Sequence, residues 1–366
     1  MANDTEVAAM RRAIDLAASA LGRTAPNPAV GCVLLSPTGE IVGEGRHVYA
    51  DLLHAEAAAL RAAGDAALGA TAVVTLEPCA RQGRTPSCAR ALVDAGVARV
   101  VYAVADPNPE QAGGADVLRA AGVDVEGGVL DAEAARGNEA WLLAVRARRP
   151  FVTWKFAASL DGRLAAADGT SKWITGPDAR ADVHRLRAEV DAVAAGISTV
   201  LADDPHLTVR DGDALAARQP LRVVVDSTAR TPLGARVLDG AAPTLVACTE
   251  RAPAERVAAL REAKADVAVL PAADDGHTDV RALLAHLYER GVVHLLVEGG
   301  PKLAGTLVDE RLVDRVVGYV AAVAIGSGKP VLDNAGAPTI DAAWRLRLDD
   351  VAAFGNDVRL TWRPER

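Results

Sequence analysis

Aromatic residues are scarce in this sequence, which has three Phe, five Trp and four Tyr among its 366 residues. Half of the residues are nevertheless apolar, so aliphatic side chains and Ala are sufficient to build packed cores without disulfides. Because a chain of this length exceeds the usual size of a single core, we expect two domains.

Cysteine is rare as well, and four thiols in a chain of this length are too few for a disulfide framework. No apolar run approaches the length of a membrane span. The N-terminal segment MANDTEVAAMRRAIDLA is typical of an amphipathic helix and not of a secretory signal. We therefore expect a cytoplasmic protein that does not bind a membrane.

The sequence also lacks a run of Lys and Arg. Its 48 acidic and 40 basic residues leave a net charge of −8. Since the phosphate backbone of a nucleic acid attracts positively charged surfaces, an acidic chain of this kind is not expected to bind one.

Short apolar segments alternate with Ala-rich segments of helical periodicity, which indicates a layered α/β fold. In the first half we predict strands at 30–35, 71–76 and 98–104, with helices at 54–64 and 88–96. In the second half we predict strands at 151–157, 221–226, 244–249, 292–300, 314–324 and 357–363, the last two as antiparallel neighbours. The basic stretch VRARRP (145–150) separates the halves, so the predicted domains are 1–147 and 148–366.

Four polar residues of the first half have the composition of a zinc centre. His54 and Glu56 stand two positions apart, and Cys79 and Cys88 have eight residues between them. One His and two Cys supply three zinc ligands and leave a fourth tetrahedral position for water, whose pKa the metal lowers. A His-x-Glu element followed by Pro-Cys and a second Cys is typical of zinc-dependent deaminases, in which the Glu moves protons without binding the metal.

The spacing of these residues also makes physical sense. Residues two positions apart on a helix project about 200° apart, so His54 and Glu56 can face one site only if it lies beyond the N-terminus of their helix. Cys79 follows a strand and Pro78, and Cys88 precedes a helix, where the helix dipole favours a thiolate.

Other interpretations of these residues stay open at this point. An isolated His-Ala-Glu occurs by chance, and a single Cys is more often a small core residue, as we interpret Cys32 and Cys248. A structural zinc normally has four protein ligands, whereas the sequence offers three. The order of the residues and their strand–turn–helix context favour a deaminase-type centre.

A series of longer motifs resembles the bifunctional riboflavin-biosynthesis deaminase–reductases over nearly the whole chain. The first half has APNPAVGCVLL, GEGRH, HAE, TLEPC, GRTPSC and VADPNP; the second has KFAASLDGR, SKWIT, VLADDPHLTVR, VVVDS and LLVEGGPKLAG. The resemblance implies a cytidine-deaminase-like α/β/α layered domain followed by a dihydrofolate-reductase-like α/β domain. It also implies Zn²⁺ and NADPH as cofactors, a phosphoribosylated pyrimidine as substrate, and a homo-oligomer, either dimer or tetramer.

By the same resemblance, the first domain hydrolytically deaminates 2,5-diamino-6-(5-phosphoribosylamino)pyrimidin-4(3H)-one. His54, Cys79 and Cys88 are then the zinc ligands and Glu56 is catalytic. Asn27, in PNP, would hydrogen-bond the pyrimidine, although a turn beside two prolines explains it equally well.

Two segments depart from the family pattern. The family usually has Ser-His after the first Cys, where this chain has Ala80-Arg81-Gln82, and Gly-Pro or Gly-Glu-Pro before His-Ala-Glu, where it has DLL (51–53). Neither change affects a ligand or Glu56, but both fall on loops expected to line the substrate. Arg81 or Arg84 is a candidate phosphate contact, and a solvated loop arginine is the simpler interpretation of Arg81.

The second half has no G-x-G-x-x-G after a strand, so a Rossmann dinucleotide site is not supported. Instead HLLVEGGPKLAGTLVDE runs from a strand through Gly-Gly into a helix, whose first N–H groups can bind phosphate. Alone, such a pattern is often only a tight turn. With the resemblance it becomes the segment that binds the NADPH pyrophosphate, namely Gly300, Pro301, Lys302, Leu303, Ala304, Gly305 and Thr306.

The resemblance assigns the remaining reductase residues, for reduction of the ribosyl group of 5-amino-6-(5-phosphoribosylamino)uracil to the ribityl form. Matching the family's cofactor positions are Ala157, Trp173, Thr199, Asp203 and Ser227. Matching its substrate positions are Ser171, Arg187, Leu207, Arg210 and Glu298. Asp203 is expected nearest the reacting centre as a catalytic residue, and Arg187 and Arg210 are expected to bind the phosphate.

Simpler interpretations remain for several of these residues. Trp173 fits a core aromatic residue, and Arg187 fits an exposed helical arginine. Lys155 and Asp161, in WKFAASLDGR, are interpreted as a structural ion pair or cap and not as ligands.

Three alternatives remain for the whole chain. The first is a nucleoside or nucleic-acid deaminase with an unrelated second domain, which the acidity and the wide cysteine spacing disfavour. The second is a reductase with an impaired deaminase domain, and the third is an assembly subunit with a structural zinc. An open fourth coordination position together with an intact Glu56 argues against the third.

Overall fold

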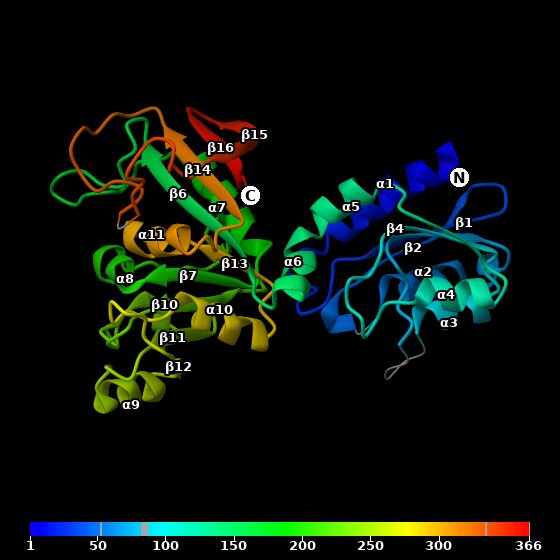
Figure 1. Ribbon diagram of the computed structural model, residues 1–366, viewed down its shortest axis with the longest axis horizontal. Helices are drawn as coiled ribbons and strands as arrows, with labels where there is room; N and C mark the ends of the chain where they lie inside the picture. Colours follow the sequence, from blue (N-terminus) through cyan, green and yellow to red (C-terminus); the bar gives the residue numbers. More distant parts are fainter. Residues whose placement is uncertain (52, 82–86, 334, 366) are drawn as a thin grey trace. The chain divides into compact units, whose positions relative to one another are not determined.

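The structure is a computed structural model that describes residues 1–51, 53–81, 87–333 and 335–365. The chain divides into two compact units, Met1–Arg149 and Pro150–Arg366 (Figure 1). Leu52, Gln82 and Arg84 of the two departing loops lie outside the described residues. Among the helices described, none combines the length and the apolar character needed to cross a membrane.

The first unit is a five-stranded sheet between two layers of helices. Its strands are β1 (Gly31–Leu35), β2 (Ile41–Arg46), β3 (Thr71–Leu76), β4 (Arg99–Val104) and β5 (Asp124–Gly127). Its helices are α1 (Asp4–Ala18), α2 (Ala55–Ala63), α3 (Cys88–Asp94), α4 (Gly114–Ala120), α5 (Asp131–Gly137) and α6 (Glu139–Ala147), with short 3-10 turns η1 (Tyr49–Asp51) and η2 (Gly64–Ala67).

The order of the strands in this sheet is β2-β1-β3-β4-β5. Strand β1 is antiparallel to β2 and β3, while β3, β4 and β5 run parallel. Helices α1 and α5 lie on one face of the sheet, and α2, α3 and α4 lie on the other (Figure 1). This is the α/β/α layering that the family resemblance implied.

Helix α2 packs against β2 more closely than a side chain would permit. A Cβ atom at Gly45 would lie 2.1 Å from the carbonyl oxygen of Ala55, at the first turn of the helix. Only glycine is therefore compatible with this approach. The close packing places the N-terminus of α2, with His54 and Glu56, directly over the sheet.

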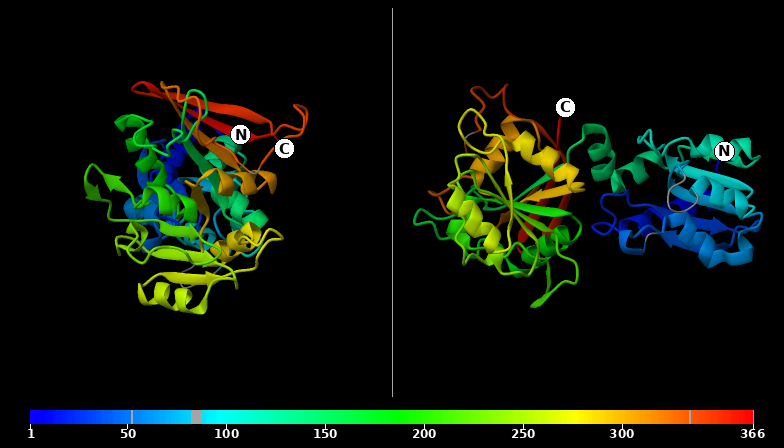
Figure 2. Two further views of the ribbon diagram at one scale, coloured as in Figure 1. Left: turned by 90° about the vertical axis from the view of Figure 1, so that its left-hand side faces the viewer. Right: turned by 90° about the horizontal axis from the view of Figure 1, so that it is seen from below.

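The second unit is a nine-stranded sheet with helices on both faces (Figure 2). Its strands are β6 (Phe151–Ser159), β7 (Ala192–Gly196), β10 (Leu221–Val225), β11 (Thr244–Cys248), β12 (Asp266–Val269), β13 (His294–Val297), β14 (Arg315–Ala321), β15 (Leu346–Phe354) and β16 (Asp357–Pro364). Its helices are α7 (Pro177–Ala188), α8 (Ile197–Asp203), α9 (Ala254–Glu262), α10 (Val280–Glu289) and α11 (Pro301–Asp309), with a 3-10 turn η3 (Arg236–Leu238). A separate hairpin is formed by β8 (Arg210–Asp211) and β9 (Ala214–Leu215).

The strand order of the large sheet is β12-β11-β10-β7-β13-β6-β14-β16-β15. The first seven run parallel, and the last two complete the sheet in antiparallel fashion. The predicted antiparallel pairing of the segments near 314–324 and 357–363 is confirmed, since Gly318 of β14 lies opposite Leu360 of β16. Strand β15 was not predicted from the sequence, because its side chains are mostly exposed and lack an apolar pattern.

Two helices leave neighbouring parallel strands toward opposite faces of this sheet. Helix α8 follows β7, and its Ile197 and Val200 join the core that includes Val193. Helix α11 follows β13, and its Leu307 joins the core on the other face with Ala194. Ligands of open α/β sheets bind outside the carboxyl ends of the strands, where the connections diverge in this way.

Candidate active sites

His54 and Glu56 lie at the start of α2, as their spacing requires. His54 is the N-cap residue with extended backbone, and Glu56 lies in the first helical turn. Glu56 is buried, with 4 % of its surface exposed. Burial raises the pKa of this carboxyl group above its ordinary value.

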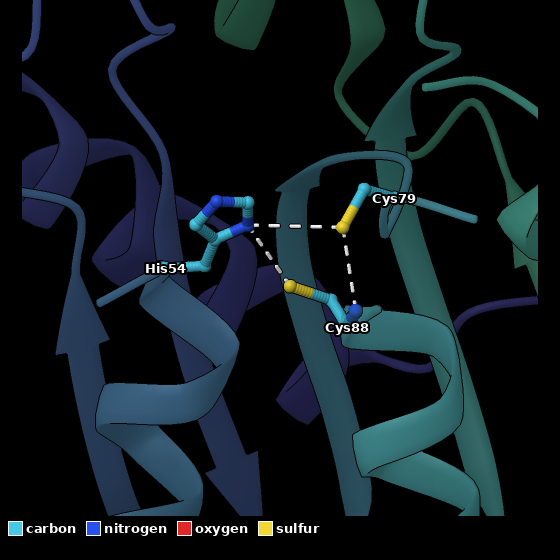
Figure 3. A group of neighbouring side chains, drawn as sticks. All are labelled: His54, Cys79 and Cys88. Atoms are coloured by element: carbon cyan, nitrogen blue, oxygen red, sulfur yellow. Dashed lines mark hydrogen bonds between the residues drawn. The ribbon is translucent and has the colours of Figure 1, made fainter. Parts of the chain in front are cut away.

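The two cysteines reach the same point from the other side. Cys79 follows β3 in the segment that leads to α3, and Cys88 is the first residue of α3 after the N-cap Ser87, whose side chain accepts from Arg90 N. The backbone N–H of Cys88 donates to Cys79 Sγ at 3.3 Å (Figure 3). The helix start therefore stabilises a thiolate at Cys79.

The three side chains converge with a geometry that fits zinc (Figure 3). His54 Nδ1 lies 3.1 Å from Cys88 Sγ and 3.7 Å from Cys79 Sγ. With Zn–S bonds of about 2.3 Å and Zn–N bonds of about 2.0–2.1 Å, the N···S edge of a tetrahedral site is about 3.6 Å. The donor set fits three corners of a zinc tetrahedron: the distance to Cys79 Sγ is close to this edge, and the distance to Cys88 Sγ is about 0.5 Å shorter.

The protonation of the thiols supports the same conclusion. The hydrogen bond from the Cys88 thiol, together with those from His54 and the Cys88 N–H, lowers the pKa of Cys79 to about 4. The same shared proton and burial raise the pKa of Cys88 well above its ordinary value. A divalent cation would replace the shared proton and hold both sulfurs as thiolates.

Asn27 is held beside this centre by a residue that the sequence reasoning did not assign. His47 Nδ1 donates to the carbonyl oxygen of Leu53 at 2.7 Å, so its Nε2 is the acceptor for Asn27 Nδ2 at 3.1 Å. The Asn27 amide oxygen is thereby directed away from His47. The Asn27 N–H also closes a turn with Thr24 O at 2.8 Å, as the turn interpretation of Asn27 expected. The His47 ring packs edge-on against that of His54.

Glu77 is a second residue that the sequence reasoning missed. Its buried carboxylate accepts backbone N–H groups from Asp106 (3.2 Å), Gly113 (3.1 Å) and Ala115 (3.0 Å). It therefore joins the end of β3, two residues before Cys79, to the VADPNP segment and to the start of α4. A Cβ atom at Gly114 would lie 1.7 Å from Pro78 O, so the helix packs directly on the backbone beside Cys79.

The departing loop beside Cys79 is described as far as Arg81. Ala80 N donates to Gln111 O at 2.8 Å, and Arg81 forms an exposed ion pair with Glu110 at 2.7 Å. This arrangement agrees with the interpretation of Arg81 as a solvated loop arginine.

In the second unit, the starts of α8 and α11 are joined across the point where the two helices diverge. Gly300 N donates to Thr199 Oγ1 at 3.0 Å. Pro301 is the first residue of α11 and has no N–H, so the first-turn donors of the helix are those of Lys302 and Leu303. Such an N-terminus fits a pyrophosphate group, which is the part of NADPH that the sequence assigned to it.

Glu298 is the centre of a buried ionic cluster just beyond β13. Arg187 donates from Nε and Nη2 to the two carboxylate oxygens of Glu298, and Lys155 Nζ lies 3.6 Å from the same carboxylate. Burial opposes ionisation, but Arg187 and Lys155 outweigh it and lower the pKa of Glu298 to about 2. The interpretation of Arg187 as an exposed helical arginine is therefore wrong, because its guanidinium is occupied by a carboxylate 111 residues away.

The structure also corrects the expected partnership of Lys155 with Asp161. Lys155 is paired with Glu298, and burial lowers its pKa. Asp161 accepts instead from the backbone N–H groups of Ile325 and Gly326 and from Ser159 Oγ, so it is a cap for that loop. Lys155 lies on the same face of β6 as Ala157, since alternate residues of a strand share a face.

The SKWIT segment is tied to the end of α8. Ser171 Oγ donates to Asp203 Oδ1 at 3.3 Å, and Lys172 Nζ donates to Asp203 O at 3.2 Å. Trp173 is 70 % exposed, so its interpretation as a core aromatic residue is wrong.

The segment that carries Leu207 and Arg210 is attached to α7. Arg210 N donates to His184 Nδ1 at 3.1 Å, and Arg187 Nη1 donates to Thr208 O at 2.8 Å. Leu207 is buried with a left-handed backbone, φ 52°. The Arg210 side chain makes a backbone contact with Asp213 O at 3.3 Å.

Ser227 lies at the end of β10 and closes a polar junction. Its carbonyl oxygen accepts from Thr249 N and Oγ1, and its hydroxyl accepts from Thr278 N at 2.9 Å. It thus shares the carboxyl edge of the sheet with Thr199 and Glu298.

The interpretation of Cys32 and Cys248 as core residues is confirmed, since both are fully buried.

Comparison with known proteins agrees with both halves of this description. The family model "Cytidine and deoxycytidylate deaminase zinc-binding region" matches residues 3–104, and "RibD C-terminal domain" matches residues 150–360. The riboflavin biosynthesis protein RibD of Mycobacterium tuberculosis is 43% identical over 355 residues, 96% of either chain. RibD of Escherichia coli K12 is 42% identical over 96% of this chain and 97% of its own.

Solved structures give the same result for the fold. RibD of Acinetobacter baumannii superposes with a TM-score of 0.89 at 39% identity, covering 99% of both chains. A diaminohydroxyphosphoribosylaminopyrimidine deaminase/5-amino-6-(5-phosphoribosylamino)uracil reductase of Thermotoga maritima superposes with a TM-score of 0.87 at 33% identity, covering 98% of this chain and 99% of its own.

These matches bear on the remaining alternatives for the whole chain. The second domain is related to the RibD reductases, so the chain is not a nucleic-acid deaminase with an unrelated partner domain. The ligand set and Glu56 are present and brought together, so neither an impaired deaminase nor a subunit with a structural zinc is supported. The chain therefore belongs to the RibD family of bifunctional riboflavin-biosynthesis enzymes, which combine a zinc-dependent deaminase with an NADPH-dependent reductase.

Proposed function

We propose that residues 1–147 carry out the deamination and residues 148–366 the reduction, with the residue roles derived below. The observation that carries the first half is the convergence of His54, Cys79 and Cys88 beside the buried Glu56. Zinc bound by these three residues supplies a Lewis acid that lowers the pKa of water at its fourth position.

Glu56 moves the protons of the deamination. As a carboxylate it takes the proton that the attacking water loses, and as an acid it returns protons to the ring nitrogen and to the departing ammonia. Both roles require a carboxyl group whose pKa is close enough to neutrality for either form to be accessible. The burial of Glu56 at the start of α2 shifts its pKa upward, in the direction that both roles require.

Asn27 and His47 orient the pyrimidine ring. The tautomer of His47 is fixed by Leu53 O, and it binds the Asn27 NH₂ group. The Asn27 oxygen is then available to accept a hydrogen bond from an amino group or ring N–H of the substrate. His47 is thus a positioning residue for the substrate contact.

Replacing Glu56 with Gln tests the deaminase proposal. The amide has the same size but cannot carry protons, so we expect deamination to fall by at least about 10²-fold, the usual contribution of a general acid–base. Zinc content and reductase activity should remain at the level of the unsubstituted protein. Retained deamination would remove Glu56 from the mechanism.

In the second domain, we propose that the carboxyl edge of the sheet binds NADPH, which would supply the hydride for C1′ of the substrate. Its pyrophosphate is bound by the segment from Gly300 to Thr306, and its other parts contact Ala157, Trp173, Thr199, Asp203 and Ser227. Asp203, whose carboxylate accepts from Ser171 and whose carbonyl oxygen accepts from Lys172, is the proposed catalytic acid–base group. Substrate contacts are contributed by Ser171, Leu207, Arg210 and Glu298.

Arg210 is the proposed phosphate anchor, and Arg187 supports it. Three of the five N–H donors of Arg187 are engaged by Glu298 and Thr208 O, so less of its guanidinium remains for a phosphate than the sequence implied. Arg187 therefore acts on the substrate mainly by holding Glu298 and the Thr208–Arg210 segment in place.

The Arg210→Ala variant tests this assignment. Loss of a charge-assisted phosphate contact worth about 1.5–3 kcal/mol raises the KM for the phosphorylated substrate by about 10–150-fold. The KM for NADPH should change less than about twofold. Arg230→Ala, at an exposed arginine of the same unit, is the matched control. Equal weakening of substrate and cofactor would refute the anchoring role.

The same proposal extends to location and assembly. Four free thiols and a net charge of −8 support a cytoplasmic protein that binds neither nucleic acid nor membrane. We further propose a homo-oligomer, dimer or tetramer, which sedimentation of the purified chain tests directly.

A further inference from the structure

Trp173 is one of the most exposed large side chains of the second unit. It is 70 % exposed, although indole is among the side chains that gain most from burial. The segment that bears it is not loose, because Ser171 and Lys172 are both bonded to Asp203 at the end of α8. An exposed ring on a fixed backbone therefore needs a separate explanation.

One face of this ring is covered by Arg180 of α7. The Arg180 guanidinium carbon lies 4.5 Å from the centroid of the Trp173 ring, within the range of a cation–π contact. The same guanidinium donates from Nη1 to Thr175 O at 2.6 Å. Arg180 thus holds both the indole and the backbone two residues after it.

The far end of the segment is anchored as well. Gly176 N donates to Oδ2 of the buried Asp357 at 2.6 Å, at the start of β16. Helix α7 begins directly after this contact, with Gly176 as N-cap and Pro177 as its first residue. Because Arg180 lies in the first turn of that helix, its position is set by the same anchor.

These contacts leave Trp173 as a platform with one face fixed and most of its surface open. A planar cation on one side of an indole restricts its rotamers and leaves the opposite face for another planar group. We propose that Arg180 is a positioning residue that holds Trp173 ready to stack against a ring of the bound NADPH. The proposal rests on the proposed function, which assigns Trp173 to the cofactor site. It adds Arg180 as the residue that fixes the orientation of the Trp173 ring.

The experiment uses the full-length protein and five variants: Arg180→Ala, Arg180→Lys, Trp173→Phe, Trp173→Ala and the double variant Arg180→Ala/Trp173→Phe. NADPH dissociation constants, KM and kcat of the reductase are measured for each. Deamination by the first domain serves as the internal control for folding and concentration, and Arg230→Ala is the matched surface control.

We expect Arg180→Ala to raise the KM and dissociation constant for NADPH by at least about fivefold with little change in kcat, because it loses the stack and the Thr175 bond together. Arg180→Lys, which retains a cation but not the fork, should be intermediate. In the Trp173→Phe background the effect of Arg180→Ala should be much smaller, because coupled residues are not additive. Acrylamide quenching of tryptophan fluorescence should increase in Arg180→Ala and fall in Trp173→Phe, which identifies the quenched residue.

Three results separate the possible failures. An NADPH affinity unaffected by Trp173→Phe and by Trp173→Ala would remove Trp173 from the cofactor site, and this inference with it. Weaker NADPH binding in the Trp173 variants with no effect of Arg180→Ala would overturn the positioning role alone. A full effect of Arg180→Ala in the Trp173→Phe background would show that Arg180 acts on the cofactor directly, which also overturns it.

Discussion

Replacing Glu77 with Gln tests whether the zinc centre depends on a buried carboxylate that does not touch the metal ligands. In the present structure one oxygen of Glu77 accepts from Gly113 N and Ala115 N, and the other accepts from Asp106 N. A Gln side chain has one oxygen, so its NH₂ group must face one of these backbone donors. The shape is preserved while one acceptor and the negative charge are lost.

The expected cost follows from these contacts. A hydrogen bond to a charged acceptor contributes about 1.5–3 kcal/mol, and a carboxylate beside the first N–H groups of a helix about 0.3–1 kcal/mol. The free energy of unfolding of the first unit should therefore fall by about 2–4 kcal/mol. For a unit of this size each kcal/mol lowers Tm by about 2–4 °C, so a fall of roughly 5–15 °C is expected.

Scanning calorimetry and zinc analysis after dialysis against a chelator measure the two consequences. Zinc retention should fall because Glu77 stands two residues before Cys79 and holds the backbone that aligns it. Glu110→Gln is the control. Glu110 belongs to the backbone segment that Glu77 holds, but its side chain forms only an exposed ion pair with Arg81. A change in Tm of 1 °C corresponds to about 0.3–0.5 kcal/mol of unfolding free energy. If Glu77→Gln changed its Tm by no more than this and kept its zinc, the dependence of the zinc centre on Glu77 would be refuted.

Two further predictions concern a ligand and a half-buried histidine. Cys79→Ser should contain less than about a tenth of the zinc of the unsubstituted protein by elemental analysis, because a hydroxyl does not replace a thiolate ligand, and undiminished zinc would contradict the ligand set. Burial lowers the pKa of His294 in the folded protein to about 4, whereas its ordinary pKa is about 6.5. Between these two pH values the unfolded chain binds more protons than the folded protein does. The free energy of unfolding therefore decreases as the pH falls through this range. Gln at position 294 can keep the hydrogen bond to Thr153 but does not titrate. Between pH 7 and pH 5, the free energy of unfolding measured in urea should therefore fall by about 2 kcal/mol less in His294→Gln than in the unsubstituted protein. An identical pH dependence of the two proteins would contradict this prediction.

The sequence was informative where function depends on short-range pattern. The order His54, Glu56, Cys79 and Cys88 predicts the zinc centre, because each residue lies at a strand end or helix start that apolar periodicity locates. The antiparallel neighbours near the C-terminus were predictable for the same reason.

Other parts of the sites depend on partners that lie far away in the sequence. The bidentate pair of Arg187 with Glu298 joins residues 111 positions apart, so the fork of Arg187 appeared free for phosphate. Lys155 pairs with Glu298 and not with its near neighbour Asp161, because adjacent parallel strands bring β6 beside β13. His47 and Glu77 carry no signal of their own, since a single His or Glu becomes important only through the backbone groups that it holds.

The most direct test of the account is mass spectrometry of the products that the purified, zinc-analysed protein forms from the diaminopyrimidine ribotide. Without NADPH, the account predicts the deaminated ribosylaminouracil and no further product. With NADPH, it predicts the ribityl compound from the same chain. Unchanged substrate under both conditions, with reduction only of pre-deaminated substrate, would contradict the claim that the deaminase centre with its Ala80-Arg81-Gln82 loop is active.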